Sequence, residues 1–155
     1  MKLGDVLRKE RERAGLQPEE VAARLGLPAG EYAELEAGLS PAEEWGPKLG
    51  RIAIVLKTPT SRLISETGRS SDAQRDTGRC GELIKQWRER SGLTQQALAT
   101  AIEVPLAEVV AVENGKSPLE SYAPLLLGCA EAVGRPVFNL FYPGGLPLDR
   151  LADYR

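Results

Sequence analysis

Histidine is absent from this chain of 155 residues, and cysteine occurs only at Cys80 and Cys129. The absence of histidine excludes the two-histidine zinc helix of metallopeptidases, Ser–His and Cys–His catalytic pairs, and sites built on imidazole ligands. Two cysteines are too few for a disulfide framework and lack the spacing of a metal site, so we expect two buried free thiols. No catalytic constellation or phosphate-binding loop stands out. We therefore expect no enzyme activity, cofactor, metal or small-molecule ligand.

Long apolar runs are missing too, and so is an excess of positive charge. No stretch approaches the roughly 18 apolar residues of a membrane span, and the N-terminus turns charged too early for a secretory signal. These absences predict a cytoplasmic protein that does not span a membrane. The formal net charge is −2, and acidic residues slightly outnumber basic ones in residues 1–66 and again in residues 80–155. Because proteins that bind nucleic acid usually present a basic face to the phosphates, charge alone does not favour such a partner.

The chain contains an internal repeat. A shift of 77 residues aligns residues 3–66 with residues 80–143 without a gap. Identities recur in one register along this length, as in the pairs Gly15 and Gly92, Pro28 and Pro105, Glu36 and Glu113, and Gly38 and Gly115. The sequence therefore predicts a tandem duplication. We call residues 1–66 copy one and residues 80–143 copy two.

The residues outside the copies have turn-forming composition. Between the copies, residues 67–79 read TGRSSDAQRDTGR, which is rich in Gly, Ser and Asp and typical of a flexible polar linker. The C-terminal tail, residues 144–155, begins with Gly144 and Gly145. Its apolar residues Leu148, Leu151 and Tyr154 are compatible with a short amphipathic turn.

Apolar spacing and helix-breaking residues predict five helices in each copy, so the fold class is all-α. Gly15 and Gly92 fall where a helix ends, and Thr94 is a good N-cap. Pro47 and Pro124 fall in the first turn of a helix, where a missing N–H is tolerated. The predicted helices are about 4–14 and 81–91, those starting at Gln17 and Thr94, about 29–36 and 106–113, about 45–56 and 122–133, and the short 60–64 and 137–141.

The apolar positions of these helices predict a core that repeats every 77 residues. Cys80 and Cys129 align with Leu3 and Ile52, which are apolar, and this favours packing over reactivity for both thiols. The predicted core consists of Leu7, Leu16, Val21, Ala22, Leu25, Leu27, Tyr32, Leu35, Leu49, Ile52, Ala53, Leu56 and Leu63, with their partners in copy two.

Both copies carry one motif of arginines, glycines and apolar residues. Copy two has Arg88, Arg90, Gly92, Leu93, Thr94, Gln95, Leu98 and Ala99, followed by Val104, Val109, Val112, Glu113, Asn114, Gly115, Ser117 and Pro118. Copy one keeps Arg11, Arg13, Gly15, Leu16, Val21, Ala22, Leu27, Leu35, Glu36, Gly38, Ser40 and Pro41. This motif resembles the Cro/C1 or XRE-type helix-turn-helix domains of phage repressors and bacterial regulators. The resemblance implies two small five-helix, lambda-repressor-like domains in tandem.

The resemblance also implies DNA binding by a transcriptional regulator, with one helix of each copy in the major groove and half-sites about 34 Å apart. The expected DNA contacts lie around the two middle helices of copy two, the one that starts at Thr94 and the one over 106–113. They comprise Thr94, Gln95, Gln96, Asn114, Lys116, Ser117 and Arg90. An alternative remains for these residues. In this alternative they do not contact DNA: Thr94 is a helix cap, the glutamines and Arg90 are ordinary exposed helix residues, and Asn114 ends a helix.

The outer positions of the presumed recognition helices lack the usual readers of base edges. Copy two has Leu106, Val110 and Ala111 there, and copy one has Glu31 and Glu34. An apolar outer face favours a second hypothesis, a degenerate helix-turn-helix module that binds protein through Leu106, Val110 and Ala111. Its partner would be a second copy of the chain, RNA polymerase, or a toxin or protease. We expect Glu36 and Glu113 to be structural and to pair with Arg13 or Arg90.

Overall fold

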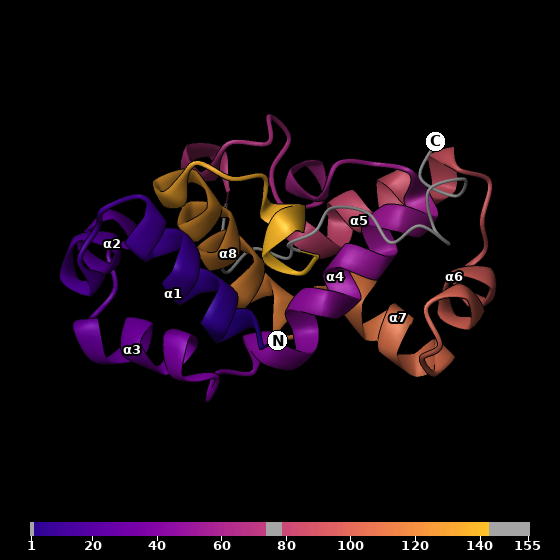
Figure 1. Ribbon diagram of the computed structural model, residues 1–155. Coiled ribbons are helices and arrows are strands. Elements are labelled where there is room, and N and C mark those ends of the chain that lie inside the picture. Colours follow the sequence, from indigo (N-terminus) through magenta and orange to yellow (C-terminus); the bar gives the residue numbers. More distant parts are fainter. Residues whose placement is uncertain (1, 74–78, 143–155) are drawn as a thin grey trace.

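The computed structural model describes residues 2–73 and 79–142, and within them it contains helices and no strand (Figure 1). The predicted all-α fold class is confirmed, whereas the predicted turn in the tail lies outside the described residues. Copy one contains α1 (Leu3–Arg13), α2 (Pro18–Leu25), α3 (Ala29–Ala37), α4 (Ala42–Leu56) and the 3₁₀ turn η1 (Thr60–Leu63). After η2 (Ser70–Asp72), copy two contains α5 (Arg79–Arg90), α6 (Gln95–Ala101), α7 (Leu106–Glu113), α8 (Leu119–Val133) and η3 (Val137–Leu140).

The repeat seen in the sequence is also present in the secondary structure. The 77-residue shift carries the bounds of α4 onto those of α8, and those of η1 onto those of η3. Two details differ from the prediction. The fourth helices begin three residues earlier, because Pro41 and Pro118 adopt helical angles and the hydroxyls of Ser40 and Ser117 accept hydrogen bonds from the first turn. The fifth elements are 3₁₀ turns and not α-helices.

The two copies exchange their fourth helices. α2 packs against α3 of its own copy and against α8 of copy two, and α6 packs in the same way against α7 and α4. The 3₁₀ turns follow the exchange, since η3 packs against α1 and η1 against α5. In Figure 1, α8 lies beside α1 and α2, while α4 reaches towards α6. We call α1–α3 with α8 the first bundle, and α5–α7 with α4 the second bundle.

Each fourth helix remains tied to its own copy at its N-terminus. Glu43 in α4 accepts hydrogen bonds from the backbone N–H groups of Leu3 and Gly4, at 3.0 and 2.8 Å, and thereby caps α1. Glu120 in α8 accepts one from Gly81 at 2.9 Å. Carboxylates are favourable at these positions because helix N-termini carry unpaired N–H groups and partial positive charge. The exchange therefore begins after the first turn of α4 and of α8.

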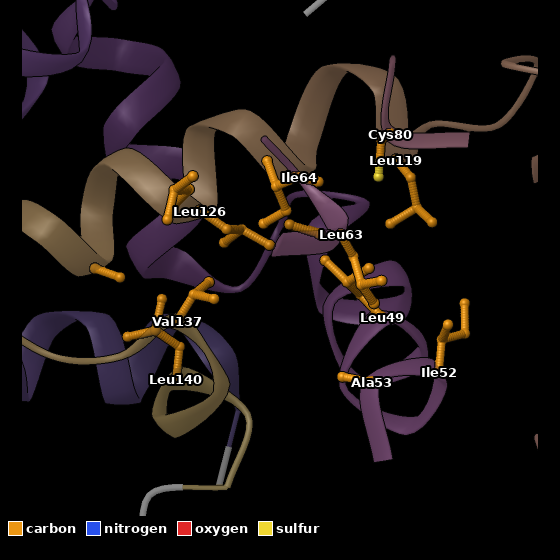
Figure 2. Packing of buried hydrophobic residues seen from close by; sticks show 14 of the residues in the cluster. Leu49, Ile52, Ala53, Leu63, Ile64, Cys80, Leu119, Leu126, Val137 and Leu140 are labelled. Carbon is orange, nitrogen blue, oxygen red and sulfur yellow. The ribbon is translucent and has the colours of Figure 1, made fainter. Parts of the chain in front are cut away.

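The exchange merges the two predicted cores into one. α4 packs against α8, and the buried apolar side chains of both copies form a single cluster. Figure 2 shows Leu49 and Ile52 of α4, Leu63 and Ile64 around the end of η1, and Leu126 of α8 within this cluster. Of the predicted core positions, Leu16, Leu25 and Leu27 and their equivalents Leu93 and Val104 are only half-buried at its edge, and Val133 is half-buried outside it.

The described part of the segment between the copies contains one short 3₁₀ turn. Residues 70–72 form η2, which packs on α8. The backbone N–H of Ser70 donates to Oε2 of Glu131 at 3.0 Å, and the hydroxyl of Thr67 donates to Asp72 at 2.6 Å. At the other end, α5 already begins at Arg79. The described part of this segment is therefore attached to the first bundle.

Candidate nucleic-acid interface

The helix pair α6 and α7 has the geometry of a helix-turn-helix. The directions of the two helices differ by 117°, across a break of four residues, which is typical of the motif. Thr94 caps α6, because its Oγ1 accepts a hydrogen bond from the N–H of Ala97 at 3.0 Å. Pro105 precedes α7 in an extended conformation that cannot continue α6. The turn between the two helices is thus set by local sequence.

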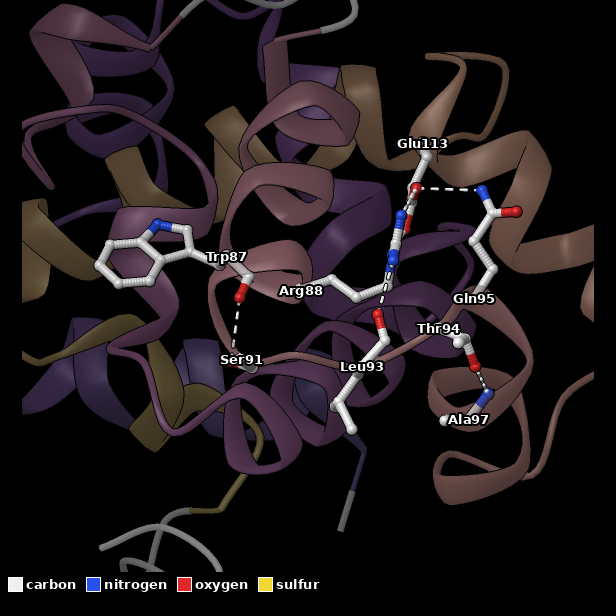
Figure 3. Close-up of polar contacts among 8 residues, drawn as sticks. All are labelled: Trp87, Arg88, Ser91, Leu93, Thr94, Gln95, Ala97 and Glu113. Atoms are coloured by element: carbon white, nitrogen blue, oxygen red, sulfur yellow. Dashed lines mark hydrogen bonds and ion pairs between the residues drawn. The ribbon is translucent and has the colours of Figure 1, made fainter.

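A buried ion pair fixes α7 against α5 (Figure 3). Nε and Nη2 of Arg88 donate to the two carboxylate oxygens of Glu113 at 2.6 and 3.0 Å, and Nη1 donates to the carbonyl of Leu93 at 2.7 Å. The hydrogen bonds to Glu113 raise the pKa of Arg88 further above its ordinary value. A two-pronged pair of this kind sets direction as well as distance, so Arg88 fixes the orientation of α7.

Copy one contains the same pair. Arg11 donates to Glu36 at 2.6 and 3.0 Å and to the carbonyl of Leu16 at 3.0 Å. The prediction that the glutamates are structural is confirmed, but the predicted partners Arg13 and Arg90 are wrong. Arg13 pairs with Glu10 on the exposed side of α1. The reason is helical phase, since Arg11 and Arg88 face the core and the arginines two positions later face outward.

Two of the expected contact residues on α6 are held by internal hydrogen bonds. Nε2 of Gln95 donates to Oε1 of Glu113 at 3.1 Å, which extends the Arg88 network, and the side chain is half-buried. Nε2 of Gln96 donates to Oγ1 of Thr100 at 3.2 Å on the exposed side of α6. An exposed bond of this strength exchanges readily for another partner, because its net free energy is about 1 kcal/mol. Gln96 is therefore accessible, whereas Gln95 supports the fold.

The residues that follow α7 also comprise both accessible residues and residues that support the fold. Asn114 and Lys116 are exposed, and Asn114 ends the helix. Ser117 is buried, with its Oγ accepting from the N–H of Leu119 at 3.2 Å. Arg90 is exposed at the end of α5 and lies over the ring of Trp87, 4.8 Å from its centre. Of the expected contact residues at the ends of α7 and α5, those that are exposed are thus Asn114, Lys116 and Arg90.

The outer face of α7 is apolar and acidic, as the sequence indicates. Leu106 is 41% exposed, and Val110 and Ala111 are half-buried beside it. Glu108 is neutralised by a residue that sequence reasoning missed, Lys48 of α4, whose Nζ lies 3.0 Å from Oε1 of Glu108. Burial alone would lower the pKa of Lys48, but its hydrogen bonds to Glu108 and Glu44 raise it. No local signal reveals this pair, because α4 belongs to the other copy.

The two thiols are packing residues. Cys80 and Cys129 are both buried and unpaired, which confirms the sequence prediction. Burial raises the pKa of Cys129 to about 12 and also raises the pKa of Cys80. Thiols that stay protonated at neutral pH are poor nucleophiles and poor metal ligands. Within residues 2–73 and 79–142, no three acidic or cysteine side chains gather as metal ligands.

Comparison with protein families identifies both copies. A family model described as a helix-turn-helix domain matches residues 2–61, and a second one, described as helix-turn-helix, matches residues 84–123. The two matches support two Cro/C1-type helix-turn-helix domains in tandem. Comparison with curated proteins and with solved structures gave no match.

The two helix-turn-helix matches point to a DNA-binding regulator in general, and DNA-binding families with this domain are typically not enzymatic. A separate question is whether any segment spans a membrane. Among the described residues, no single helix is long and apolar enough to do so. Only α6 and α7 taken together reach the required length, and they are sharply bent.

Proposed function

We propose that this protein is a transcriptional regulator that binds DNA mainly through its second bundle. The observation that carries the proposal is the helix-turn-helix of α6 and α7, with Asn114 and Lys116 exposed just after α7. Gln96 and Arg90 add two more accessible polar groups around the same helix pair. Gln95 and Ser117 act indirectly, because their polar atoms hold α7 and α8 in place. Phosphate contacts of this kind fix the register of a protein on the duplex.

The first bundle contributes differently to DNA binding. α3 and α7 occupy equivalent places in the two bundles and lie at the lower left and lower right of Figure 1. On α3, however, Glu31 and Glu34 are exposed, and exposed carboxylates are repelled by phosphate. Copy one also has Pro18 and Glu19 in place of Gln95 and Gln96. The regulator we propose is therefore asymmetric, and it acts at a promoter by occluding RNA polymerase or recruiting it.

The proposal is tested by fluorescence anisotropy of the full chain with two labelled DNAs, a random duplex and a duplex from its own upstream region. Binding is measured at salt concentrations from about 25 to about 200 mM, because phosphate contacts weaken strongly over this range. We expect salt-dependent binding that Lys116→Ala weakens, with a log–log salt slope smaller by about 0.9. Lys9→Ala, an exposed lysine on α1, is the control with the same change of charge. Absence of binding to any DNA at the lowest salt would refute the proposal.

A second function is favoured by one observation, the exposure of Leu106 on the outer face of α7. An apolar residue at this place fits a protein contact better than a base contact. The interaction module would use Leu106, Val110 and Ala111 to bind a second copy of the chain. Replacement of Leu106 and Val110 by Lys is then expected to reduce the mass measured by light scattering to that of one chain. An unchanged mass would exclude self-association through this face.

A further inference from the structure

The two bundles differ at one charged position next to their third helices. This position is Lys48 of α4, which pairs with Glu108 of α7. In the second bundle, Nζ of Lys48 lies 3.0 Å from Glu108 of α7, 3.1 Å from Glu44, and 4.4 Å from the centre of the Trp45 ring. The lysine side chain is 14% exposed. The second bundle thus contains a complete internal ammonium site, made of a carboxylate on the recognition helix, an aromatic ring and the cation itself.

The first bundle has similar surroundings without the cation, except that Ser121 stands at the position of Glu44. The 77-residue shift places Glu31 at the position of Glu108 and Tyr122 at the position of Trp45, but it replaces Lys48 by Leu125. Copy one adds a second carboxylate, Glu34, where copy two has Ala111. Among the residues that the structure describes, no side chain forms an ion pair or hydrogen bond with Glu31 or Glu34. Two carboxylates therefore face a place from which the cation is missing.

A cavity occupies that place. It has a volume of about 270 Å³ and is lined by the carboxylate-bearing Glu31 and Glu34, by the apolar Leu27, Leu35, Pro41 and Leu125, and by Ser40, Ser121 and Tyr122. In the second bundle, Lys48, Trp45 and Glu108 line a cavity that reaches further into the core, to Ile84 and Leu98, and has a volume of only about 10 Å³. Pockets for drug-sized ligands are commonly about 300–1,000 Å³. The cavity in the first bundle is therefore of a size for one long side chain.

We propose that this cavity binds the lysine side chain of a partner protein. The alkyl stem lies along Leu35 and Leu125, and the ammonium group takes the position that Lys48 holds in the other bundle, beside Glu31, Glu34 and the Tyr122 ring. The structure also favours a peptide over a free polyamine. Leu39, which precedes Ser40 in the cavity wall, is 74% exposed and offers an apolar contact to a residue next to the lysine. The partner is thus a segment in which lysine is flanked by apolar residues, and its binding does not depend on contact with DNA.

The test uses the full chain and a defined peptide, acetyl-Gly-Leu-Lys-Leu-Gly-amide, titrated into isotopically labelled protein and followed by NMR. The reference peptide has norleucine in place of lysine, which keeps the alkyl chain and removes the ammonium group. We expect saturable shifts centred on residues 31–35 and Tyr122 with the lysine peptide alone. The double variant Glu31→Gln, Glu34→Gln is expected to weaken binding about tenfold or more, because two charge-assisted contacts are lost. Both positions are exposed, so this variant is expected to fold.

Two further variants exchange the sites between the bundles. Leu125→Lys supplies an internal cation to Glu31 and is expected to abolish peptide binding, whereas Lys48→Leu opens the equivalent space beside Glu108 and is expected to create a second site. Glu12→Gln, Glu19→Gln carries the same change of net charge at exposed positions and is expected to bind like the wild type. Equal binding of the norleucine peptide, or no saturable shift in the wild type, would overturn the proposal. Displacement of the peptide by spermidine at equal or lower concentration would assign the cavity to a free polyamine instead.

Discussion

Arg88 and Glu113 are joined by two parallel hydrogen bonds, of 2.6 and 3.0 Å, and the Glu113 side chain is only 2% exposed. The pair links the first and third helices of copy two. It also positions Gln95, which donates to the same carboxylate. The ion pair is thus the point from which the orientation of the recognition helix is set.

Removal of one partner of this pair is expected to cost much stability. Glu113→Ala leaves the Arg88 guanidinium buried without a counter-charge, and the expected loss is about 3–5 kcal/mol in the free energy of unfolding. Urea denaturation of the full chain measures it. Glu89→Ala, an exposed position on α5, is the control and is expected to change stability by less than about 0.5 kcal/mol. A loss below about 1 kcal/mol for Glu113→Ala would show that the pair does not support the fold.

The first helix of each copy passes the end of its third helix too closely for a side chain. A Cβ atom on Gly81 would collide with the backbone carbonyl of Val112, and one on Gly4 would meet the carbonyls of Leu35 and Glu36 at 2.5 Å. We expect Gly81→Ala to destabilise the protein by about 3 kcal/mol, because the backbone itself has to shift.

Gly30 in α3 is the matched control for this substitution. A Cβ atom there meets no atom within 4 Å. Gly30→Ala is expected to stabilise the protein by about 0.5–1 kcal/mol, the usual gain from replacing an unconstrained helical glycine. Thermal unfolding followed by circular dichroism measures both variants. Equal melting temperatures for the two would contradict the close approach of α5 and α7.

The exchange of the fourth helices predicts that the two copies stay together when the chain between them is cut. Insertion of a protease site between residues 73 and 79, followed by cleavage, is expected to leave a complex with the mass and helical content of the intact chain. The reason is that α8 is packed in the first bundle and α4 in the second. Size-exclusion chromatography with light scattering gives the answer. Two separately eluting, folded fragments would contradict the exchange and would support independent domains.

Glu120 predicts a pH dependence of stability. Burial raises its pKa above the ordinary 4.5 and outweighs the backbone N–H groups of Gly81 and Cys80, which lower it. Because the folded state binds the proton more tightly than the unfolded chain, Glu120 contributes most to stability at acid pH, and this contribution is lost as the pH rises through the folded pKa. Glu120→Gln removes this titration. It is therefore expected to be more stable than the wild type at pH 7, with the difference shrinking towards pH 4.

Urea denaturation of both proteins at several pH values between 4 and 7 measures that difference. A wild type that is more stable than Glu120→Gln at pH 7 would contradict it. Glu43→Gln is the matched variant in copy one. Both carboxylate oxygens of Glu43 accept backbone N–H groups, so an amide there loses one acceptor. The expected cost is about 1 kcal/mol at pH 7.

The features that depend on short-range sequence patterns are predictable here. Thr94 is identified as a cap because a hydroxyl before an apolar helix is favourable in any context. The bounds of α3 and α7 follow from Pro28, Pro105, Gly38 and the end of the apolar pattern, and the structure agrees within one residue. The repeat gives an independent check on each predicted core position, because its equivalent 77 residues away must also be apolar. This is why the core and the family could be inferred from one sequence.

The exchange of α4 and α8 could not be predicted, because an exchanged helix presents the same apolar face as one that stays in its own copy. The side-chain contacts that depend on the exchange could not be predicted either. Lys48 and Glu108 are 60 residues apart in the chain, and their pairing depends on which copy α4 joins. Gln95 matches the family position of a DNA contact, yet its amide is bound to Glu113. Only the three-dimensional arrangement separates these positioning groups from the accessible ones.

The exchange also sets the order in which the fold can be completed. Arg135 pairs with Glu10 at 2.9 Å across 125 residues, and α2 is covered by α8. Contacts so far apart in sequence form slowly and only after the later segment exists. During synthesis, copy one therefore emerges with the inner face around Val21 and Leu25 uncovered, and it stays so until residues 119–133 have left the ribosome. The first bundle can therefore close only after all residues up to about 133 have been made.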